Sequence, residues 1–322
     1  MKTAIIGAGA WGTALAIIAT QANGRAMIWG RDSANMEAMD RARENKSRLP
    51  GIALPEGLSC IASPVQLRQA ECLIIATPAQ ALRATMTQLR DNLRPGIPAL
   101  IAAKGIERGS GLFMSEVLRE AAPRLEPFCL SGPSFARDVA AGLPTAVALA
   151  GDTAHELAAA LSTPTFRIYA NSDLRGAEIG GAVKNVLAIA CGISDGLGLG
   201  ESARAALTTR GFAELIRLGE ALGARRGTLL GLSGLGDLLL TCASAQSRNF
   251  RLGVRLARGE TAQDPSGAVV EGAWTAPVVV ELARKHALEM PVAEAVSRVL
   301  DGTSTPDKEV SRLLGRPLRA EF

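Results

Sequence analysis

A glycine-rich stretch near the start of the chain constrains the fold more than any other part of this sequence. Residues 7–12 (GAGAWG) follow a short apolar run at 3–6 and lead into a longer one at 13–18. A strand, a glycine turn and a helix start in this order are typical of a dinucleotide-binding βαβ unit. The glycines allow the tight turn, the approach of a pyrophosphate, and close packing of helix on strand. Gly7, Gly9 and Gly12 are therefore predicted to bind a dinucleotide.

The same segment has an alternative interpretation as a secretory signal or a short membrane span. Residues 3–22 carry no charge and follow Lys2. A signal sequence has an apolar region of about 7–15 residues before a small-residue cleavage site, whereas spaced glycines interrupt this one. No other stretch approaches the roughly 20 apolar residues that a span needs. We therefore expect a cytoplasmic protein without a membrane span.

The composition indicates two globular domains and disfavours nucleic-acid binding. At 322 residues the chain exceeds the roughly 150 residues of one domain, and 48% hydrophobic with 20% charged residues is ordinary for a folded protein. The net charge of +4 comes from scattered arginines, with only 3% aromatic residues. This pattern lacks the basic stripe of a nucleic-acid interface.

Cysteine and histidine show no arrangement that would support metal binding. The five cysteines lack CxxC spacing and lie in apolar contexts, and His155 and His286 lie away from carboxylates and thiols. We expect reduced thiols in a reducing compartment, no metal site and no histidine general base.

Alternating short apolar runs and helical segments fill the first half of the chain. Strands are expected near residues 2–6, 25–29, 72–76, 97–102, 127–130, 145–149 and 165–169, and helices near 11–22, 63–69, 79–91, 111–121, 133–141 and 153–161. Only helices are expected afterwards, near 174–195, 202–222, 235–243, 248–258, 272–286 and 291–301. The predicted fold is α/β, with a Rossmann-like, mostly parallel sheet domain at 1–172 and an all-α domain at 173–322. A cleft between them would hold the reacting groups.

The end of the second expected strand bears on the choice of cofactor. Arg31 would lie on the adenine or accept the 2′-phosphate of NADP, whereas Asp32 would hold the free 2′-hydroxyl of NAD or cap a helix at 33–43. We favour NADPH, with NADH tolerated.

Lys184 stands out because the segment around it, residues 180–190, is apolar on nearly every side. Burial lowers the pKa of a lysine, which makes it a usable acid or base near neutral pH. The alternative is a surface lysine that reaches water. Lys104 follows an apolar run at 100–103, where a ligand would lie, or is simply a charged strand end.

Three further segments suit a phosphorylated substrate. Residues 131–135 (SGPSF) are expected to end a strand and open a helix with Pro133 in its first position. Asp237, in a glycine-rich turn, would orient the lysine or act as a helix N-cap. Arg248, after Ser247 and before Asn249, would clamp a phosphate at a helix start or be an exposed first-turn residue.

Together these residues closely resemble the bacterial type of NAD(P)-dependent glycerol-3-phosphate dehydrogenase. The motifs that carry the resemblance lie at residues 7–15 (GAGAWGTAL), 104–105 (KG), 131–136 (SGPSFA), 178–186 (EIGGAVKNV), 234–237 (GLGD), 246–249 (QSRN) and 269–272 (VVEG). The resemblance implies interconversion of dihydroxyacetone phosphate and sn-glycerol 3-phosphate, which supplies phospholipid synthesis. A homodimer is also implied by the resemblance alone.

The resemblance also implies roles for individual residues. The catalytic proton acceptor falls on Lys184, and Asp237, Lys104 and Asn185 would assist it. Substrate contacts fall on Lys104, Gly132, Ser134, Lys184, Asp237, Ser247, Arg248 and Asn249. Cofactor contacts fall on Ala10, Trp11, Arg31, Lys104, Ala136, Arg248, Val269 and Glu271.

Two other functions compete with this interpretation. A related two-domain reductase of a non-phosphorylated carbonyl, such as a ketopantoate or imine reductase, would share the cofactor half but leave Arg248 and Asn249 unexplained. A redox sensor that binds NAD(P) without turnover would leave both lysines unexplained.

Overall fold

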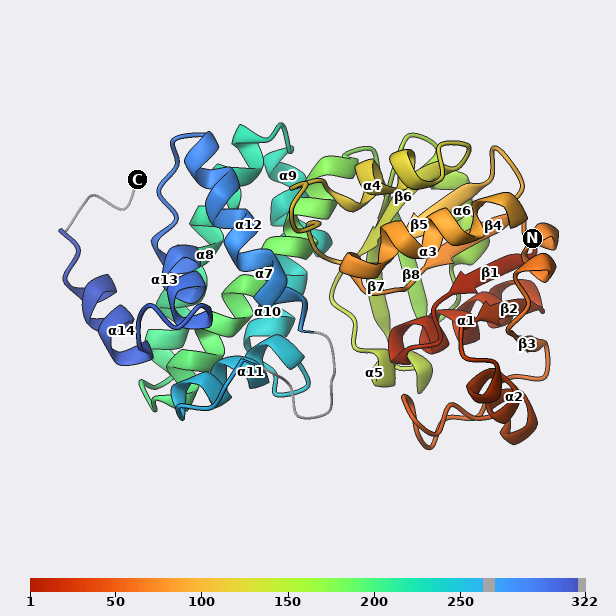
Figure 1. Ribbon diagram of the computed structural model, residues 1–322, viewed down its shortest axis with the longest axis horizontal. Coiled ribbons are helices and arrows are strands. Elements are labelled where there is room, and N and C mark those ends of the chain that lie inside the picture. The colour runs from red at the N-terminus through yellow and green to blue at the C-terminus, as the bar shows by residue number, and fades with distance from the viewer. Residues whose placement is uncertain (263–269, 318–322) are drawn as a thin grey trace.

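The computed structural model consists of a sheet-containing half and a helical half that lie side by side (Figure 1). The structure describes residues 1–262 and 270–317. The N-terminal half contains every strand of the described residues, and the C-terminal half is built only from helices. The predicted fold class is therefore confirmed.

One eight-stranded sheet forms the centre of the N-terminal half, in the order β3-β2-β1-β4-β5-β6-β7-β8. Its strands are β1 (Thr3–Ile6), β2 (Ala26–Trp29), β3 (Leu58–Ile61), β4 (Cys72–Ile75), β5 (Pro98–Ile101), β6 (Glu126–Ser131), β7 (Thr145–Ala150) and β8 (Phe166–Asn171). All neighbouring pairs are parallel except β6 and β7. The carboxyl ends of β1, β2, β4, β5 and β6 therefore share one edge, where ligands of such sheets bind.

Helices cover both faces of this sheet, as expected for a sheet buried on both sides. They are α1 (Ala10–Asn23), α2 (Ser33–Ala42), η1 (Pro64–Gln69), η2 (Ala79–Ala81), α3 (Leu82–Leu89), η3 (Arg90–Asn92), α4 (Met114–Ala121), α5 (Ala136–Ala140) and α6 (Ala154–Leu161). One apolar cluster includes residues of α1, α2, α5 and α6, and a second includes those of α3 and α4. The glycine-rich loop lies between β1 and α1, at the ligand-binding edge.

Two local features of this half differ from the sequence predictions. Strand β3 was not expected, because Ser59 interrupts its short apolar run. Pro133 does not occupy the first position of a helix, because α5 begins only at Ala136. Residues 132–135 instead form a bent loop, in which the Ser134 hydroxyl donates to the Gly132 carbonyl at 3.1 Å.

The C-terminal half is assembled around the long helix α7 (Leu174–Gly196). Around it lie α8 (Glu201–Ala221), α9 (Arg226–Leu230), the π-helical turn η4 (Leu232–Gly236), α10 (Asp237–Cys242), α11 (Arg248–Ala257), α12 (Glu271–Lys285), α13 (Pro291–Leu300) and α14 (Pro306–Leu314). The short helices α9 and α14 were not expected, and the helix expected at 235–243 is replaced by η4 and α10. The predicted division between residues 172 and 173 falls in the connection from β8 to α7.

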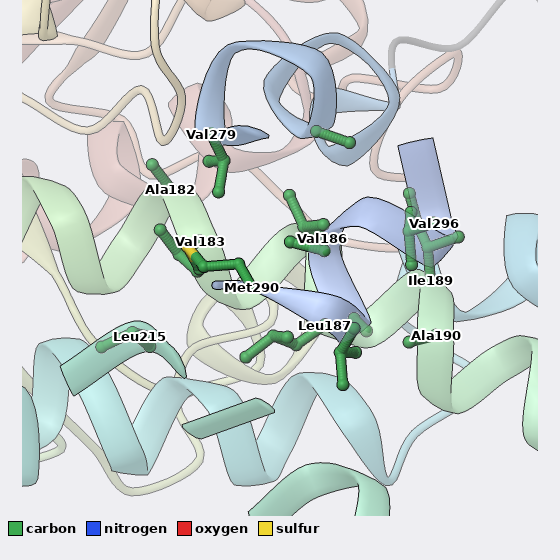
Figure 2. Packing of buried hydrophobic residues seen from close by; sticks show 14 of the residues in the cluster. Ala182, Val183, Val186, Leu187, Ile189, Ala190, Leu215, Val279, Met290 and Val296 are labelled. Carbon is green, nitrogen blue, oxygen red and sulfur yellow. The ribbon is translucent and has the colours of Figure 1, made fainter. Parts of the chain in front are cut away.

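Close packing explains why α7 is apolar on all sides. Figure 2 shows Val183, Val186 and Leu187 of α7 among side chains of α8, α12 and α13. On another side, α11 approaches so closely that a β-carbon at Gly192 would overlap the Phe250 carbonyl oxygen. Among the described residues, α7 is the one helix long and apolar enough to cross a membrane, and its apolar window is completely buried in the protein. Its hydrophobicity is accounted for by the core.

Candidate active site

A cleft of about 1380 Å³ lies where the two halves meet. Its walls include the glycine-rich loop and the ends of β2, β4 and β5 on one side, and residues of α7, α10, α11 and α12 on the other. Of the predicted site residues, the cleft is lined by Gly7, Gly9, Ala10, Trp11, Arg31, Lys104, Ser134, Ala136, Lys184, Asn185, Asp237, Ser247, Arg248, Asn249 and Glu271. Val269 lies outside the described residues.

The three glycines of the loop meet three different geometric demands. Gly7 has a φ of +113°, and a β-carbon there would lie 3.0 Å from the Ala76 carbonyl oxygen. A β-carbon at Gly12 would overlap the carbonyl oxygen of Gly7, whereas one at Gly9 would meet open space. Gly9 is the N-cap of α1 and no side chain caps this helix. The loop therefore offers free backbone N–H groups and room for a pyrophosphate.

The residues after β2 distinguish between the two roles considered for Asp32. Its side chain accepts a hydrogen bond from the Asn35 backbone N–H at 3.0 Å, so it is the N-cap of α2. Arg31 is exposed, lines the cleft and has no hydrogen-bonding or ionic partner in the described part of the chain. Its guanidinium is available for an anionic ligand.

Glu271 begins α12 and has one oxygen without a partner. Its Oε1 accepts from the Ala79 backbone N–H at 3.0 Å, whereas its Oε2 is buried and has no hydrogen bond within the described residues. The hydroxyl of Thr77, which also lines the cleft, is likewise buried and has no hydrogen bond there. Burial raises the pKa of the Glu271 carboxyl above its usual range, although Arg248 acts in the opposite direction. Unpaired buried polar atoms are costly unless a ligand supplies partners. Together with the open glycine loop, they fit a nicotinamide dinucleotide.

Two lysines share a single buried carboxylate at the substrate end of the cleft. Asp237, on α10, accepts from Lys184 Nζ through Oδ1 at 2.8 Å and from Lys104 Nζ through Oδ2 at 2.6 Å. Lys184 is buried, and Lys104 also donates to the Gly132 carbonyl at 3.1 Å. Lys184 is therefore not a surface lysine. The N-cap of α10 is Gly236, so Asp237 is not a cap and its carboxylate serves the lysines.

Thr241 completes the surroundings of Lys184. Its hydroxyl donates to the Asp237 carbonyl at 2.6 Å, and it lies 2.8 Å from Lys184 Nζ. Because that hydroxyl hydrogen is already used, the Thr241 hydroxyl oxygen accepts a hydrogen bond from Lys184 Nζ. Thr241 was not predicted from the sequence, although its position one helical turn after Asp237 on a buried helix was the available signal.

The electrostatics of this cluster favour a lysine that titrates near neutral pH. Burial lowers the pKa of Lys184 to about 8, and Asp237 opposes that shift while Lys104 adds to it. Burial would raise the pKa of Asp237, but the charges of Lys104 and Lys184 outweigh it, and the pKa lies below its usual range. Asp237 is therefore ionised, and Lys184 can exchange a proton at physiological pH.

A chain of amide hydrogen bonds joins α7, α11 and α12 beside the lysines. Asn185 donates to the Lys104 carbonyl at 3.2 Å and accepts from Asn249 Nδ2 at 2.9 Å. Asn249 in turn accepts from the Gly272 backbone N–H at 2.9 Å. Both asparagines are buried, so this network fixes the positions of the walls on which the substrate would lie.

The start of α11 lies at the wall of the cleft. Ser247 is its N-cap and accepts from the Phe250 backbone N–H, so Arg248 and Asn249 occupy the first two helical positions. Arg248 is exposed to the cleft and no hydrogen bond or ion pair of its side chain occurs within the described residues. Gly132 does not itself border the cleft, but its carbonyl accepts from Lys104 and Ser134, which do.

Family models for the N-terminus and C-terminus of NAD-dependent glycerol-3-phosphate dehydrogenase match residues 2–157 and 173–311. The chain belongs to this family. A glycerol-3-phosphate dehydrogenase [NAD(P)+] of Parvibaculum lavamentivorans is 51% identical over 99% of this chain and 98% of its own length. The enzyme of the same name from Bradyrhizobium sp. strain ORS 278 is 53% identical over 99% of this chain and 97% of its own length.

The solved structures agree with this family. A glycerol-3-phosphate dehydrogenase from Coxiella burnetii has a TM-score of 0.92 at 39% identity, covering 98% of this chain and 99% of that one. A ketopantoate reductase of Ralstonia eutropha has a TM-score of 0.63 at 15% identity, covering 96% of this chain and 100% of that one. This second likeness shows a shared fold alone. The findings support the main interpretation over both alternatives.

Within the described residues no group of three or more His, Cys, Asp or Glu side chains is arranged to hold a metal ion.

Proposed function

We propose that this chain is an NAD(P)-dependent glycerol-3-phosphate dehydrogenase that interconverts dihydroxyacetone phosphate and sn-glycerol 3-phosphate in the cytoplasm, for phospholipid synthesis. The observation that carries the proposal is the buried Lys184 amine, held by Asp237 and Thr241 at the wall of the cleft that also contains the glycine-rich loop. A homodimer, implied by the family resemblance, is part of the same proposal.

Lys184 is the proton donor in reduction and the acceptor in oxidation. Of the three protons on its ammonium, one is directed at Asp237 and one at Thr241, which leaves the third for the substrate oxygen. In reduction this proton passes to the carbonyl oxygen while the carbonyl carbon receives the hydride. In oxidation the neutral amine accepts the proton of the hydroxyl group. Bound nicotinamide supplies or accepts the hydride.

Asp237 and Lys104 set the charge around this transfer. Asp237 stabilises the ammonium form of Lys184, and the second ammonium, on Lys104, lies on the same carboxylate. Negative charge that develops on the substrate oxygen is therefore close to two cations in a buried site, where electrostatic stabilisation is strong. The Asn185 side chain donates to the backbone carbonyl of Lys104 and so helps to hold Lys104 in position beside Lys184.

The phosphate of the substrate binds at the start of α11. The guanidinium of Arg248, which has no hydrogen-bond or ionic partner within the described residues, supplies charge, and the backbone N–H groups of Arg248 and Asn249, which the Ser247 side chain does not cap, supply hydrogen bonds. The side chain of Asn249 already bonds Asn185 and Gly272, so its contribution comes mainly from the backbone. Ser247 contributes by fixing the helix start.

NADPH is the preferred cofactor in this proposal. The Asp32 carboxylate, which would otherwise hold a ribose hydroxyl, caps α2, while the neighbouring Arg31 guanidinium has no partner within the described residues. A free guanidinium beside a committed carboxylate favours a 2′-phosphate.

Absorbance of the reduced nicotinamide tests the reaction directly. We expect the band to decay when enzyme is mixed with NADPH and dihydroxyacetone phosphate, more slowly with NADH, and negligibly with unphosphorylated dihydroxyacetone. Turnover of an unphosphorylated carbonyl, with none of dihydroxyacetone phosphate, would instead identify a different reductase.

Replacing Arg248 by glutamine tests the phosphate anchor. The lost charge-assisted hydrogen bonds are worth about 1.5–3 kcal/mol, so the KM for dihydroxyacetone phosphate should rise on the order of 10- to 100-fold. The matched control is Arg258→Gln, at the exposed far end of α11 and outside the cleft lining. An unchanged KM in Arg248→Gln would place the phosphate elsewhere.

A further inference from the structure

A tight turn after α2 forms part of the cofactor wall that the glycine-rich loop begins. The turn runs from Asn45 to Leu49, whose backbone N–H donates to the Asn45 carbonyl at 2.8 Å. Ser47, Arg48 and Leu49 line the cleft, whereas Lys46 in the same turn does not. No family motif identified in the sequence includes this turn.

The side chain of Asn45 fastens this turn to the glycine-rich loop. Asn45 is completely buried, and its Nδ2 donates to the Ala8 carbonyl at 3.0 Å and to Thr13 Oγ1 at 2.8 Å. Its Oδ1 accepts from the Arg48 backbone N–H and from Ser47 Oγ, each at 3.2 Å. Every donor hydrogen and the acceptor oxygen of this amide is therefore used. One side chain thus joins the backbone of Arg48 to the loop expected to approach the cofactor pyrophosphate.

The turn is held from its other end as well. Arg137 Nη1, from α5, lies 3.4 Å from the Pro50 carbonyl that follows the turn. By contrast, the guanidinium of Arg48 is exposed and has no hydrogen bond or ion pair to any residue that the structure describes. A fixed backbone that presents a free, planar cation is preorganised for a bidentate contact with a phosphate.

The charge of the surrounding cleft favours the same ligand. Arg31, Arg48 and Arg137 all line the cleft from the N-terminal half, and Asp32, which lines the same side, is committed to capping α2. The other acidic lining residues among those described, Asp237 and Glu271, belong to helices of the C-terminal half. A lining with excess positive charge beside a helix N-terminus attracts polyanions.

The geometry points to Arg48 as a second phosphate-binding guanidinium of the cofactor site, positioned by Asn45. The ligand chemistry is a phosphate group of the nicotinamide dinucleotide, either its diphosphate or the 2′-phosphate of NADP. This inference rests on the proposed use of NAD(P)H, but not on the identity of the ketone substrate.

The test compares Arg48→Gln with the matched control Lys46→Gln, which removes a positive charge from the same turn but not from the cleft. Dissociation constants for NADPH and NADH are measured from nicotinamide fluorescence without any ketone. We expect the Kd of NADPH to rise on the order of tenfold in Arg48→Gln and less than twofold in Lys46→Gln. If the wild-type enzyme binds NADPH tightly but does not turn over dihydroxyacetone phosphate, that result would contradict the proposed reaction and not the role of Arg48.

The two cofactors distinguish between the two phosphate groups. A rise in Kd for NADPH alone assigns Arg48 to the 2′-phosphate, and an equal rise for both assigns it to the diphosphate; either result supports the inference. Arg48→Lys, which keeps the charge but not the planar fork, should recover part of the affinity. Unchanged Kd values for both cofactors in Arg48→Gln, with an unaltered Tm, would overturn it.

Discussion

The variant Lys184→Ala is expected to lower kcat by about 10²- to 10⁴-fold in both directions, which is the usual contribution of a positioned acid or base. The loss should appear in kcat because the third proton of the ammonium is used in the transition state. The proposed position of the cofactor is along the glycine-rich loop rather than on α7, so the Kd for NADPH should remain within a few-fold of wild type. Steady-state rates and a fluorescence titration measure the two quantities.

Two further variants separate chemistry from packing. Lys184→Met keeps an unbranched chain in the buried wall but has no proton to give, so it should be as inactive as Lys184→Ala while retaining more thermal stability. Lys285→Ala removes an exposed lysine from α12 and should leave kcat unchanged. Near-normal turnover of Lys184→Met would show that another group transfers the proton.

The fold of the N-terminal half could be predicted because parallel strands buried on both faces are continuous apolar runs. The direction in which each strand pairs could not be predicted, since β7 has the same apolar character as its neighbours but runs antiparallel to β6. Strand β3 was not predicted for a different reason. It is stabilised by pairing with β2 rather than by a pattern of its own.

The candidate site shows a similar division between chemistry and partners. A lone lysine in an apolar helix is conspicuous, so Lys184 could be found from the sequence. The sequence could not show that Lys104 and Lys184 share the Asp237 carboxylate, because Asp237 is 133 residues further along the chain than Lys104. Thr241 has only its spacing from Asp237 as a sequence signal and Asn45 has none, so their burial and hydrogen bonds are what show which groups they hold.

The variant Asp237→Asn is expected to lower kcat for dihydroxyacetone phosphate reduction by about 10²- to 10³-fold near neutral pH. An amide is nearly the same size but cannot offset two ammonium groups, so Lys104 and Lys184 would repel each other across it. Breaking a buried ion pair is also destabilising, so we expect a lower Tm together with the loss of rate. Asp195→Asn, which removes a half-exposed carboxylate from the end of α7, is the matched control.

The pH profile separates an electrostatic role of Asp237 from simple loss of structure. In wild type, reduction needs protonated Lys184, so kcat/KM should fall as pH rises through about 8, whereas oxidation needs the amine and should fall as pH drops below about 8. The Asp237 charge raises the pKa of Lys184. Without it, both midpoints should move to lower pH by roughly one to three pH units. If the substitution only unfolded part of the enzyme, the rate would fall by the same factor at every pH and the midpoints would not move. An unmoved midpoint in Asp237→Asn would therefore mean that Asp237 does not set the pKa of the catalytic lysine.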